Sequence, residues 1–142
     1  MTIRKVKSVW NGTLKEGKGK MDITGYSGPF TFATRFENAK GTNPEELVGA
    51  AQSGCYSMFL SALISGEGLN PESIETEAAV TLGEVDGGPA ITNIKLSTVV
   101  KCEGLSQEKF AELSVAAKEK CPISRLYAGG TATIDLKAEL IK

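Results

Sequence analysis

Apolar and polar residues alternate with a period of two in three segments, and this alternation predicts β-strands because successive side chains of a strand point to opposite faces. Residues 30–37 carry three phenylalanines of one parity, which places Arg35 and Glu37 on the other face. Residues 91–102 and 132–140 each present one inward face, formed by Ile94, Leu96, Thr98, Val100 and Cys102 in the first and by Ala132, Ile134, Leu136, Ala138 and Leu140 in the second. Further strands are predicted within residues 3–29 and over 74–83, where a turn signal at 86–89 follows.

Two segments carry the signals that start helices. Asn43 suits the N-cap and Pro44 the first position of a helix that we expect to run to about residue 65. A second helix should follow Ser106 and end around Cys121, because Pro122 cannot continue it. The order of elements is then βββ-α-ββ-α-β. This order favours an α+β fold with antiparallel sheets around a long central helix, in a single domain over residues 1–142.

The first helix carries no charge over the 20 residues from Leu47 to Gly66. It has an apolar ridge and a ridge of small side chains, consisting of Leu47, Ala51, Cys55, Phe59 and Leu63, and of Gly49, Ser53, Ser57, Ser61 and Ser65. Its glutamine and four serines favour a buried helix over a membrane span. Because a helix without charge must be covered nearly all round, we expect a homodimer in which two copies of it pack together. The alternative is a central helix inside a monomer.

Composition narrows the classes of function. With 16 Lys+Arg against 17 Asp+Glu, the net charge is −1, which gives no electrostatic reason to expect nucleic acid or an anionic membrane as a partner. The chain of 142 residues contains no histidine, so a Ser-His-Asp triad, a Cys-His pair and a histidine-ligated metal are excluded. Its start, residues 1–5, lacks the apolar run of a secretory signal. We therefore expect a cytoplasmic protein whose cysteines are reduced at rest.

The three cysteines are the candidates for chemistry. Cys55 and Cys121 face inward on the two helices, where inert packing is the ordinary role of a thiol. Cys102 lies on the inward face of a strand with no activating neighbour, so we expect it to serve only packing. No CxxC motif is present, so neither a zinc site nor a CxxC redox site is expected. What remains is a pair of thiols, one on each helix, that the fold could bring together.

Several motifs, in this order, resemble one known family. They are Thr34-Arg35-Phe36-Glu37, then residues 40–47 (Lys-Gly-Thr-Asn-Pro-Glu-Glu-Leu), Cys55, and Cys121-Pro122-Ile123-Ser124. The chain is similar over essentially its whole length to the osmotically inducible protein C (OsmC) family, which is related to the organic hydroperoxide resistance (Ohr) proteins.

The resemblance implies an antioxidant thiol peroxidase that reduces organic hydroperoxides as an intertwined homodimer, without metal or other cofactor. It assigns the peroxide-reactive cysteine to Cys55 and the resolving cysteine to Cys121, with Arg35 and Glu45 as their charged partners. An external dithiol, lipoyl compounds included, would reduce the resulting disulfide. This sequence departs from the family in having Gln52 where many members carry a histidine, and in a shorter segment before Phe30.

A thiol is mostly protonated near neutrality, so Cys55 needs a nearby cation, and the forked guanidinium of Arg35 suits this task. Glu45 would be the counterion of that arginine. Ten residues of helix separate Glu45 from Cys55 by about 15 Å along the axis, so the two cannot share a site within one straight helix. The hypothesis is that Glu45 reaches Cys55 and Cys121 from the other subunit. Apolar residues on the same helix (Leu47, Met58, Phe59, Leu63) would favour hydrophobic alkyl peroxides.

Two other functions fit a pair of intracellular thiols. One is a non-catalytic binder of small hydrophobic ligands, in which both cysteines are core packing. The other is a redox sensor whose Cys55–Cys121 bridge switches a partner. Arg35 and Glu45 weigh against the binder, which needs no cation beside a thiol, and turnover distinguishes an enzyme from a sensor.

Overall fold

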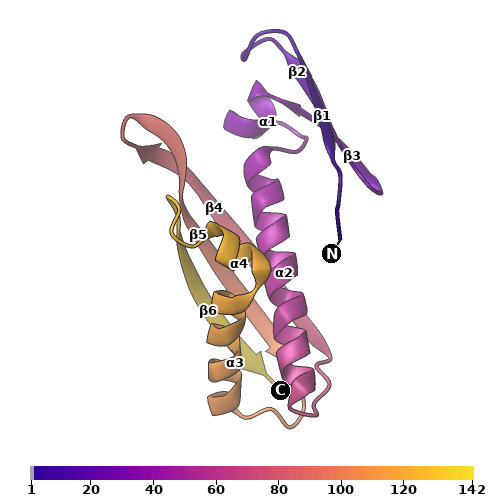
Figure 1. Ribbon diagram of the computed structural model, residues 1–142, viewed down its shortest axis with the longest axis vertical. Coiled ribbons are helices and arrows are strands. Elements are labelled where there is room, and N and C mark those ends of the chain that lie inside the picture. Colours follow the sequence, from indigo (N-terminus) through magenta and orange to yellow (C-terminus); the bar gives the residue numbers. More distant parts are fainter. Residues whose placement is uncertain (1) are drawn as a thin grey trace. The chain divides into compact units, whose positions relative to one another are not determined.

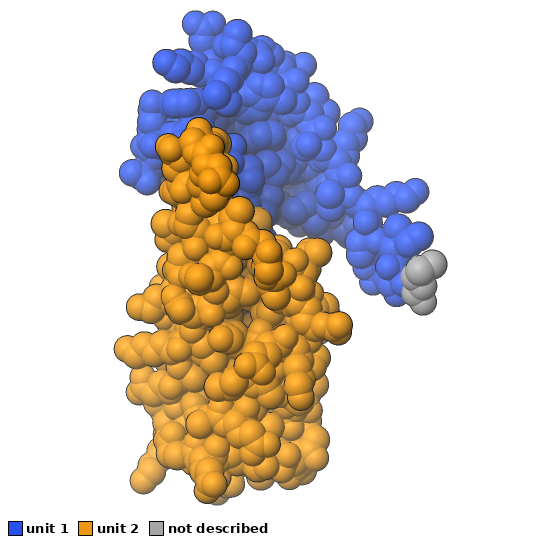
Figure 2. Space-filling model, turned by 60° about the vertical axis from the view of Figure 1, so that its left-hand side comes forward, with its two compact units in different colours: residues 1–47 blue, residues 48–142 orange. Residues whose placement is uncertain are grey.

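The computed structural model describes residues 2–142, which form six strands and four helices (Figure 1). In chain order these are β1 (Lys7–Asn11), β2 (Lys18–Ile23), β3 (Tyr26–Thr31), α1 (Phe32–Phe36), α2 (Pro44–Gly66), β4 (Ser73–Val85), β5 (Gly88–Lys101), α3 (Gln107–Lys120), α4 (Pro122–Tyr127) and β6 (Thr133–Ile141). The chain divides into two compact units, residues 1–47 and residues 48–142 (Figure 2). The α+β class predicted from the sequence is confirmed.

The first unit contains an antiparallel sheet in the order β1-β2-β3. Gly19 pairs with Trp10 on one side and with Phe30 on the other, and the two aromatic rings lie 5.1 Å apart. A Cβ atom at position 19 would lie 2.5 Å from the Phe30 ring and 2.7 Å from Trp10. Glycine is therefore required where two rings from neighbouring strands pack over the middle one.

The prediction of a strand over residues 30–37 is wrong beyond Thr31, because helix α1 begins there. The hydroxyl of Thr31 accepts a hydrogen bond from the N–H of Thr34, and the hydroxyl of Thr34 accepts one from the N–H of Thr31. This reciprocal capping box starts a helix. Phe32 and Phe36 then stack one turn apart, with ring centroids at 4.8 Å. The parity that they share on a strand is also the four-residue spacing of a helix.

Helix α2 begins and ends as predicted. Asn43 caps it, since its side-chain oxygen accepts a hydrogen bond of 2.8 Å from the N–H of Glu46. By length and composition alone this helix could cross a membrane, with a mean hydropathy of 1.4 over an 18-residue window, of which 28% is buried within the chain. Most of the uncharged part of this helix is thus left without full cover by the described residues.

The second unit is built on the sheet β4-β5-β6. Asp86 and Gly87 connect β4 to β5 with φ angles of 52° and 77°, as a two-residue hairpin turn with positive φ at both positions requires. The predicted inward face of β5 is confirmed, because Ile94, Leu96, Thr98, Val100 and Cys102 are all buried. The predicted alternation of the last strand is also confirmed in β6.

The expectation of purely antiparallel sheets is wrong for one pair of strands. Strand β6 runs parallel to β5, in a register that pairs Asn93 with Thr133 and Lys101 with Ile141. A parallel neighbour needs a long crossover, which α3 and α4 supply between the two strands. The second sheet is therefore mixed.

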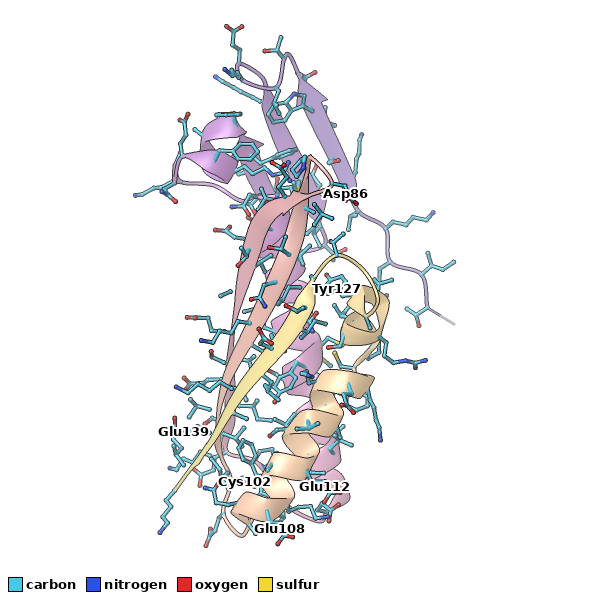
Figure 3. All side chains as sticks on the ribbon, turned by 90° about the vertical axis from the view of Figure 1, so that its left-hand side faces the viewer. Asp86, Cys102, Glu108, Glu112, Tyr127 and Glu139 are labelled. Carbon is cyan, nitrogen blue, oxygen red and sulfur yellow. The ribbon has the colours of Figure 1, made fainter. Side chains whose placement is uncertain are left out.

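Helices α2 and α3 lie on the same face of this sheet (Figures 1 and 3). The buried line of α2 consists of Gly49, Gln52, Tyr56, Leu60 and Ile64, and it meets a buried face of α3 that consists of Phe110, Leu113, Ser114 and Ala117. The core-facing line of α2 is thus neither of the two ridges predicted from the sequence.

The small ridge of α2 faces β4 of the same chain. A Cβ atom on Gly49 would lie 3.1 Å from Val80, and the hydroxyl of Ser57 donates a 2.8 Å hydrogen bond to Thr76. The side of the helix that is left exposed carries Ala50, Ala51, Gly54, Met58 and Ala62. This uncharged exposed stripe is the part of α2 that residues 2–142 leave uncovered.

Candidate active site

Cys55 and Cys121 lie together in the second unit, although 66 positions separate them in the sequence. Cys55 is half-buried on α2, and Cys121 is fully buried between α3 and α4. The thiol of Cys121 is near enough to Cys55 to raise the pKa of the Cys55 thiol. One sulfur of the pair is therefore partly accessible to a small molecule, whereas the other is accessible chiefly to its neighbours.

Cys121 ends one helix and begins the next. Its N–H donates to the carbonyl of Ala117, which closes α3, and its sulfur accepts a 3.3 Å hydrogen bond from the N–H of Ser124, which opens α4. Pro122 stands at the first position of α4, where a missing N–H costs nothing. The predicted end of the helix around Cys121 is confirmed, and the same residue caps the helix that follows.

Burial raises the pKa of the Cys55 thiol above its ordinary value. A hydrogen bond from the backbone N–H of Ile123 opposes this effect, and the neighbouring thiol of Cys121 adds to it. The second unit by itself therefore keeps Cys55 protonated near neutral pH. A thiolate at this position requires a cation from elsewhere.

A buried polar group that sequence reasoning did not find lies beside Cys121. The sulfur of Cys121 is 3.1 Å from the hydroxyl of Ser124, and that oxygen accepts a 2.6 Å hydrogen bond from Nε2 of Gln52. Gln52 is fully buried and Ser124 is 2% exposed. The Cys-Pro-x-Ser motif and the departure at Gln52 were both visible in the sequence, but nothing there indicated that they touch.

Arg35 and Glu45 form an ion pair within the first unit. Nη2 of Arg35 lies 2.6 Å from Oε1 of Glu45, and Nε lies 3.1 Å from both carboxylate oxygens. The arginine side chain is 36% exposed and the glutamate 13%. The carboxylate thus holds one edge of the guanidinium, which leaves the Nη1 edge available to a ligand.

An aromatic hollow of about 210 Å³ adjoins this arginine in the first unit. Its lining includes Trp10, Phe30, Phe32, Phe36 and Arg35 itself. The guanidinium also lies over the ring of Phe36, at 5.3 Å from the ring centroid. Arg35 therefore has an apolar neighbourhood on one side and a carboxylate on the other.

Cys102 has no part in the pair of thiols. It lies just beyond the end of β5, near the start of α3, whereas Tyr127 on α4 lies toward the other end of this unit (Figure 3). Burial raises the pKa of the Cys102 thiol, and the charge of Glu72 raises it further. The predicted inward position of this cysteine is confirmed.

The apolar surroundings expected for Cys55 are partly wrong, because Met58 is 78% exposed. An apolar hollow of about 250 Å³ is instead lined by Val48, Leu126, Tyr127 and neighbouring residues of the sheet and the 130–132 segment. Val48 precedes Cys55 by seven residues and so lies on the same side of α2, about 10 Å along the helix. Helix α4, which begins after Cys121, provides the opposite wall.

Solved structures define the class of fold. An OsmC-like protein from Mycoplasma pneumoniae superposes with a TM-score of 0.79 over 99% of both chains, at 14% identity. The organic hydroperoxide resistance protein OhrB of Bacillus subtilis superposes with a TM-score of 0.68 at 28% identity, covering 96% of this chain and 98% of that one. The architecture is that of the OsmC-like proteins.

Sequence comparison identifies the family. The family model described as OsmC-like protein matches residues 37–137. Peroxiredoxin OsmC of Escherichia coli is 44% identical over 132 residues, which cover 89% of this chain and 91% of that protein. OhrB of Bacillus subtilis is 34% identical over 83% of this chain and 87% of its own length. The chain belongs to the OsmC family, related to the Ohr proteins, as its motifs predicted, and a peroxidase-type redox function is supported for that family.

Proposed function

We propose that this protein is a thiol peroxidase that reduces organic hydroperoxides to alcohols through Cys55. The observation that carries the proposal is the contact between two thiols of unequal exposure. The half-buried thiol can meet a peroxide, while the fully buried thiol is placed to react with the product of that encounter. A ligand-binding core needs no such arrangement.

The proposed reaction has three balanced steps. The Cys55 thiolate attacks the distal peroxide oxygen, the O–O bond breaks, and the alkoxide takes a proton to leave as alcohol, with Cys55 oxidised to sulfenic acid. The sulfur of Cys121 then attacks the sulfenic sulfur, which forms a disulfide and releases water. An external dithiol finally reduces that disulfide by two thiol–disulfide exchanges and is itself oxidised to a disulfide.

Arg35 would supply the cation that Cys55 lacks. A guanidinium beside the sulfur stabilises the thiolate, and the same donor stabilises the alkoxide charge that develops as the O–O bond breaks. Glu45 would hold the arginine in place by the ion pair of 2.6 Å. Because Glu45 and Cys55 are ten residues apart on α2, we propose that the partner subunit supplies Glu45 and, through the ion pair, Arg35 with it.

The exposed stripe of α2 supports a homodimer. This stripe is uncharged over more than three turns and includes Ala51, Gly54, Met58 and Ala62. Small side chains let a second helix approach closely, so two copies of α2 packed together would cover what one chain leaves exposed. The two apolar hollows, beside Arg35 and beside α4, support alkyl or aryl hydroperoxides as substrates in preference to hydrogen peroxide.

Steady-state consumption of cumene hydroperoxide, measured with several dithiols that include dihydrolipoamide, tests the proposal. The wild-type protein should turn over many equivalents, and Cys55→Ser should lose that activity. Cys102→Ser is the matched control and should keep the native rate. A Cys55→Ser variant that consumes peroxide at the native rate would refute the assignment, and a single oxidation without turnover would favour the redox sensor.

Mixed dimers test which subunit supplies Glu45 to each active site. A heterodimer of one Cys55→Ser subunit and one Glu45→Ala subunit carries both lesions in one site if the partner supplies the glutamate. The other site is then intact, so about half of the wild-type activity should remain. An inactive heterodimer would show that each subunit uses its own Glu45.

A further inference from the structure

A hydrogen bond between two buried side chains joins helix α2 to helix α4 beside the pair of thiols. Nε2 of Gln52 donates to the hydroxyl oxygen of Ser124 at 2.6 Å, and both residues are at most 2% exposed. Gln52 stands three positions before Cys55 on α2, where residues three apart are neighbours on the helix surface. Ser124 stands three positions after Cys121 and lies 3.1 Å from its sulfur. The hydrogen bond and the two thiols are therefore adjacent, between the same two segments of the chain.

Helix α4 depends on contacts of this kind for its position. It has six residues, Pro122–Tyr127, and a helix this short is not stable by itself. Its first turn is attached to Cys121, because the N–H of Ser124 donates to the sulfur of Cys121 at 3.3 Å. A group that holds Ser124 in place therefore also holds that sulfur. Among residues 2–142, the bond from Gln52 to Ser124 is the hydrogen bond that joins a side chain of α2 to one of α4.

The stability of the core does not explain a glutamine at this position. Gln52 is fully buried, and its second polar atom, Oε1, has no hydrogen-bond partner among residues 2–142. A buried polar atom without a partner lowers stability, so an apolar side chain of similar size would fill the position without loss. The contact that the amide does make, with Ser124, is therefore the reason for its place.

We propose that Gln52 and Ser124 are positioning residues, whose hydrogen bond holds the sulfur of Cys121 within reach of Cys55 for disulfide formation. A disulfide forms within narrow limits, with the two Cβ atoms about 3.5–4.5 Å apart, so a small shift of α4 would take the sulfurs out of range. A misplacement of about 1 Å can slow a reaction about 100-fold. The place of this contact in a catalytic cycle rests on the proposed function, whereas the contact itself does not.

The consequence concerns the lifetime of the Cys55 sulfenic acid. In the proposed cycle the sulfur of Cys121 attacks the sulfenic sulfur, a sulfur–sulfur bond forms, and the hydroxyl leaves with the thiol proton as water. A sulfenic acid that waits for Cys121 can instead meet a second hydroperoxide. That encounter oxidises it to sulfinic acid, which dithiols do not reduce, and converts the hydroperoxide to alcohol. A contact that speeds the first reaction therefore protects the enzyme from the second.

The first test needs no peroxide. In a full-length Cys102→Ser protein, oxidised dithiothreitol takes two electrons from Cys55 and Cys121, which gives the protein disulfide and reduced dithiothreitol. Gln52→Met should raise several-fold the ratio of oxidised to reduced dithiothreitol at which half of the protein is oxidised, because the contact and the disulfide favour each other reciprocally. The Tm of the reduced protein should not fall. Ser114→Ala, which removes a buried hydroxyl without a hydrogen-bond partner, is the matched control and should leave the ratio unchanged.

The second test measures how the oxidised Cys55 divides between two products. With one equivalent of cumene hydroperoxide and dimedone present, the ratio of dimedone-labelled Cys55 to Cys55–Cys121 disulfide should be about tenfold higher in Gln52→Met than in Ser114→Ala. Ser124→Ala should raise this ratio as well, and Ser124→Thr, which keeps the hydroxyl, should restore it. Adding Gln52→Met to Ser124→Ala should raise it no further, because the two residues act through one contact.

Three results would overturn the proposal. One is an unchanged dithiothreitol ratio in Gln52→Met. Another is a normal product ratio in Gln52→Met beside a raised one in Ser124→Ala, since Ser124 would then act on Cys121 without Gln52. The third is a Gln52→Met protein that melts well below the parent or does not fold, which would mean that the glutamine serves the core. If cumene hydroperoxide does not oxidise the parent protein, the proposed function fails, while the dithiothreitol ratio still tests the contact.

Discussion

Replacing Arg35 by methionine should cost this protein much activity and little stability. The ion pair with Glu45 has good geometry, with three contacts of 2.6 to 3.1 Å, but the arginine side chain is 36% exposed. An exposed pair contributes about 1 kcal/mol or less, because solvent screens it and two long side chains are held in place. A loss of that size lowers Tm by about 2–5 °C in a domain of this size.

The effect on catalysis should be far larger. Removal of one preorganised donor from a developing negative charge typically costs about 10²–10³-fold in rate. In addition, burial raises the pKa of Cys55, so without the arginine its thiolate forms only at higher pH. The activity of Arg35→Met should therefore rise with pH beyond the point at which the wild-type enzyme levels off. Glu45→Gln keeps a hydrogen-bond acceptor but loses the charge. Its activity should therefore lie between that of the wild type and that of Arg35→Met.

The assay is kcat/KM for cumene hydroperoxide from pH 6 to 10, with a thermal melt of each variant. Arg35→Lys serves as the conservative control, since it keeps the charge and loses the fork, and it should recover part of the activity at pH 7. Native kcat/KM in Arg35→Met, with the same pH dependence as the wild type, would refute the role of this guanidinium. A loss of activity that merely follows a large loss of stability would also contradict the reasoning.

Three further substitutions test the stability of the core, the reactivity of Cys102 and the proposed dimer. Thr98→Val should lower the free energy of unfolding by about 1–2 kcal/mol in a denaturant titration, because this buried hydroxyl donates to a backbone carbonyl at 3.1 Å; a loss below about 0.3 kcal/mol would contradict that. Glu72→Gln should lower the pKa of Cys102, whose value that carboxylate raises, and so speed its alkylation near pH 8; an unchanged rate would argue against the charge effect. Met58→Glu should shift sedimentation from dimer to monomer by placing a charge in the uncovered stripe of α2, while Val115→Glu on α3 should not. A dimeric Met58→Glu protein would remove this stripe from the proposed interface.

Local signals in the sequence predicted much of the fold. Asn43 followed by Pro44 located the start of α2, and the alternation from Ile94 to Cys102 located the buried face of β5, because capping and period-two patterns act over a few residues. Helix α1 was missed for a local reason too. Its capping box pairs Thr31 with Thr34 in place of the usual glutamate or glutamine, so the ordinary signal was absent.

Other features depend on contacts that no local pattern encodes. The alternation in β6 shows which side chains face inward but not which way its neighbour runs, so the parallel pairing with β5 could not be predicted from it. In α2 nearly every position is apolar or small, so the pattern lacks the polar contrast that would identify the buried line.

The candidate site likewise contains residues that the sequence identified and contacts that it could not predict. The four site residues came from motifs, and the structure then showed that Cys55 meets Cys121 and that Arg35 binds Glu45. The contact of Gln52 with Ser124 could not be predicted from the sequence. These residues are 72 positions apart, and their hydrogen bond forms only once α2 and α4 have packed.

The most direct test of the central claim is a map of the disulfides formed by one equivalent of cumene hydroperoxide. The protein should lose two thiols per chain, and the peptides that contain Cys55 and Cys121 should be found joined, with Cys102 still open to alkylation after denaturation. A Cys55 that is oxidised without joining Cys121, or a bridge that involves Cys102, would contradict the account.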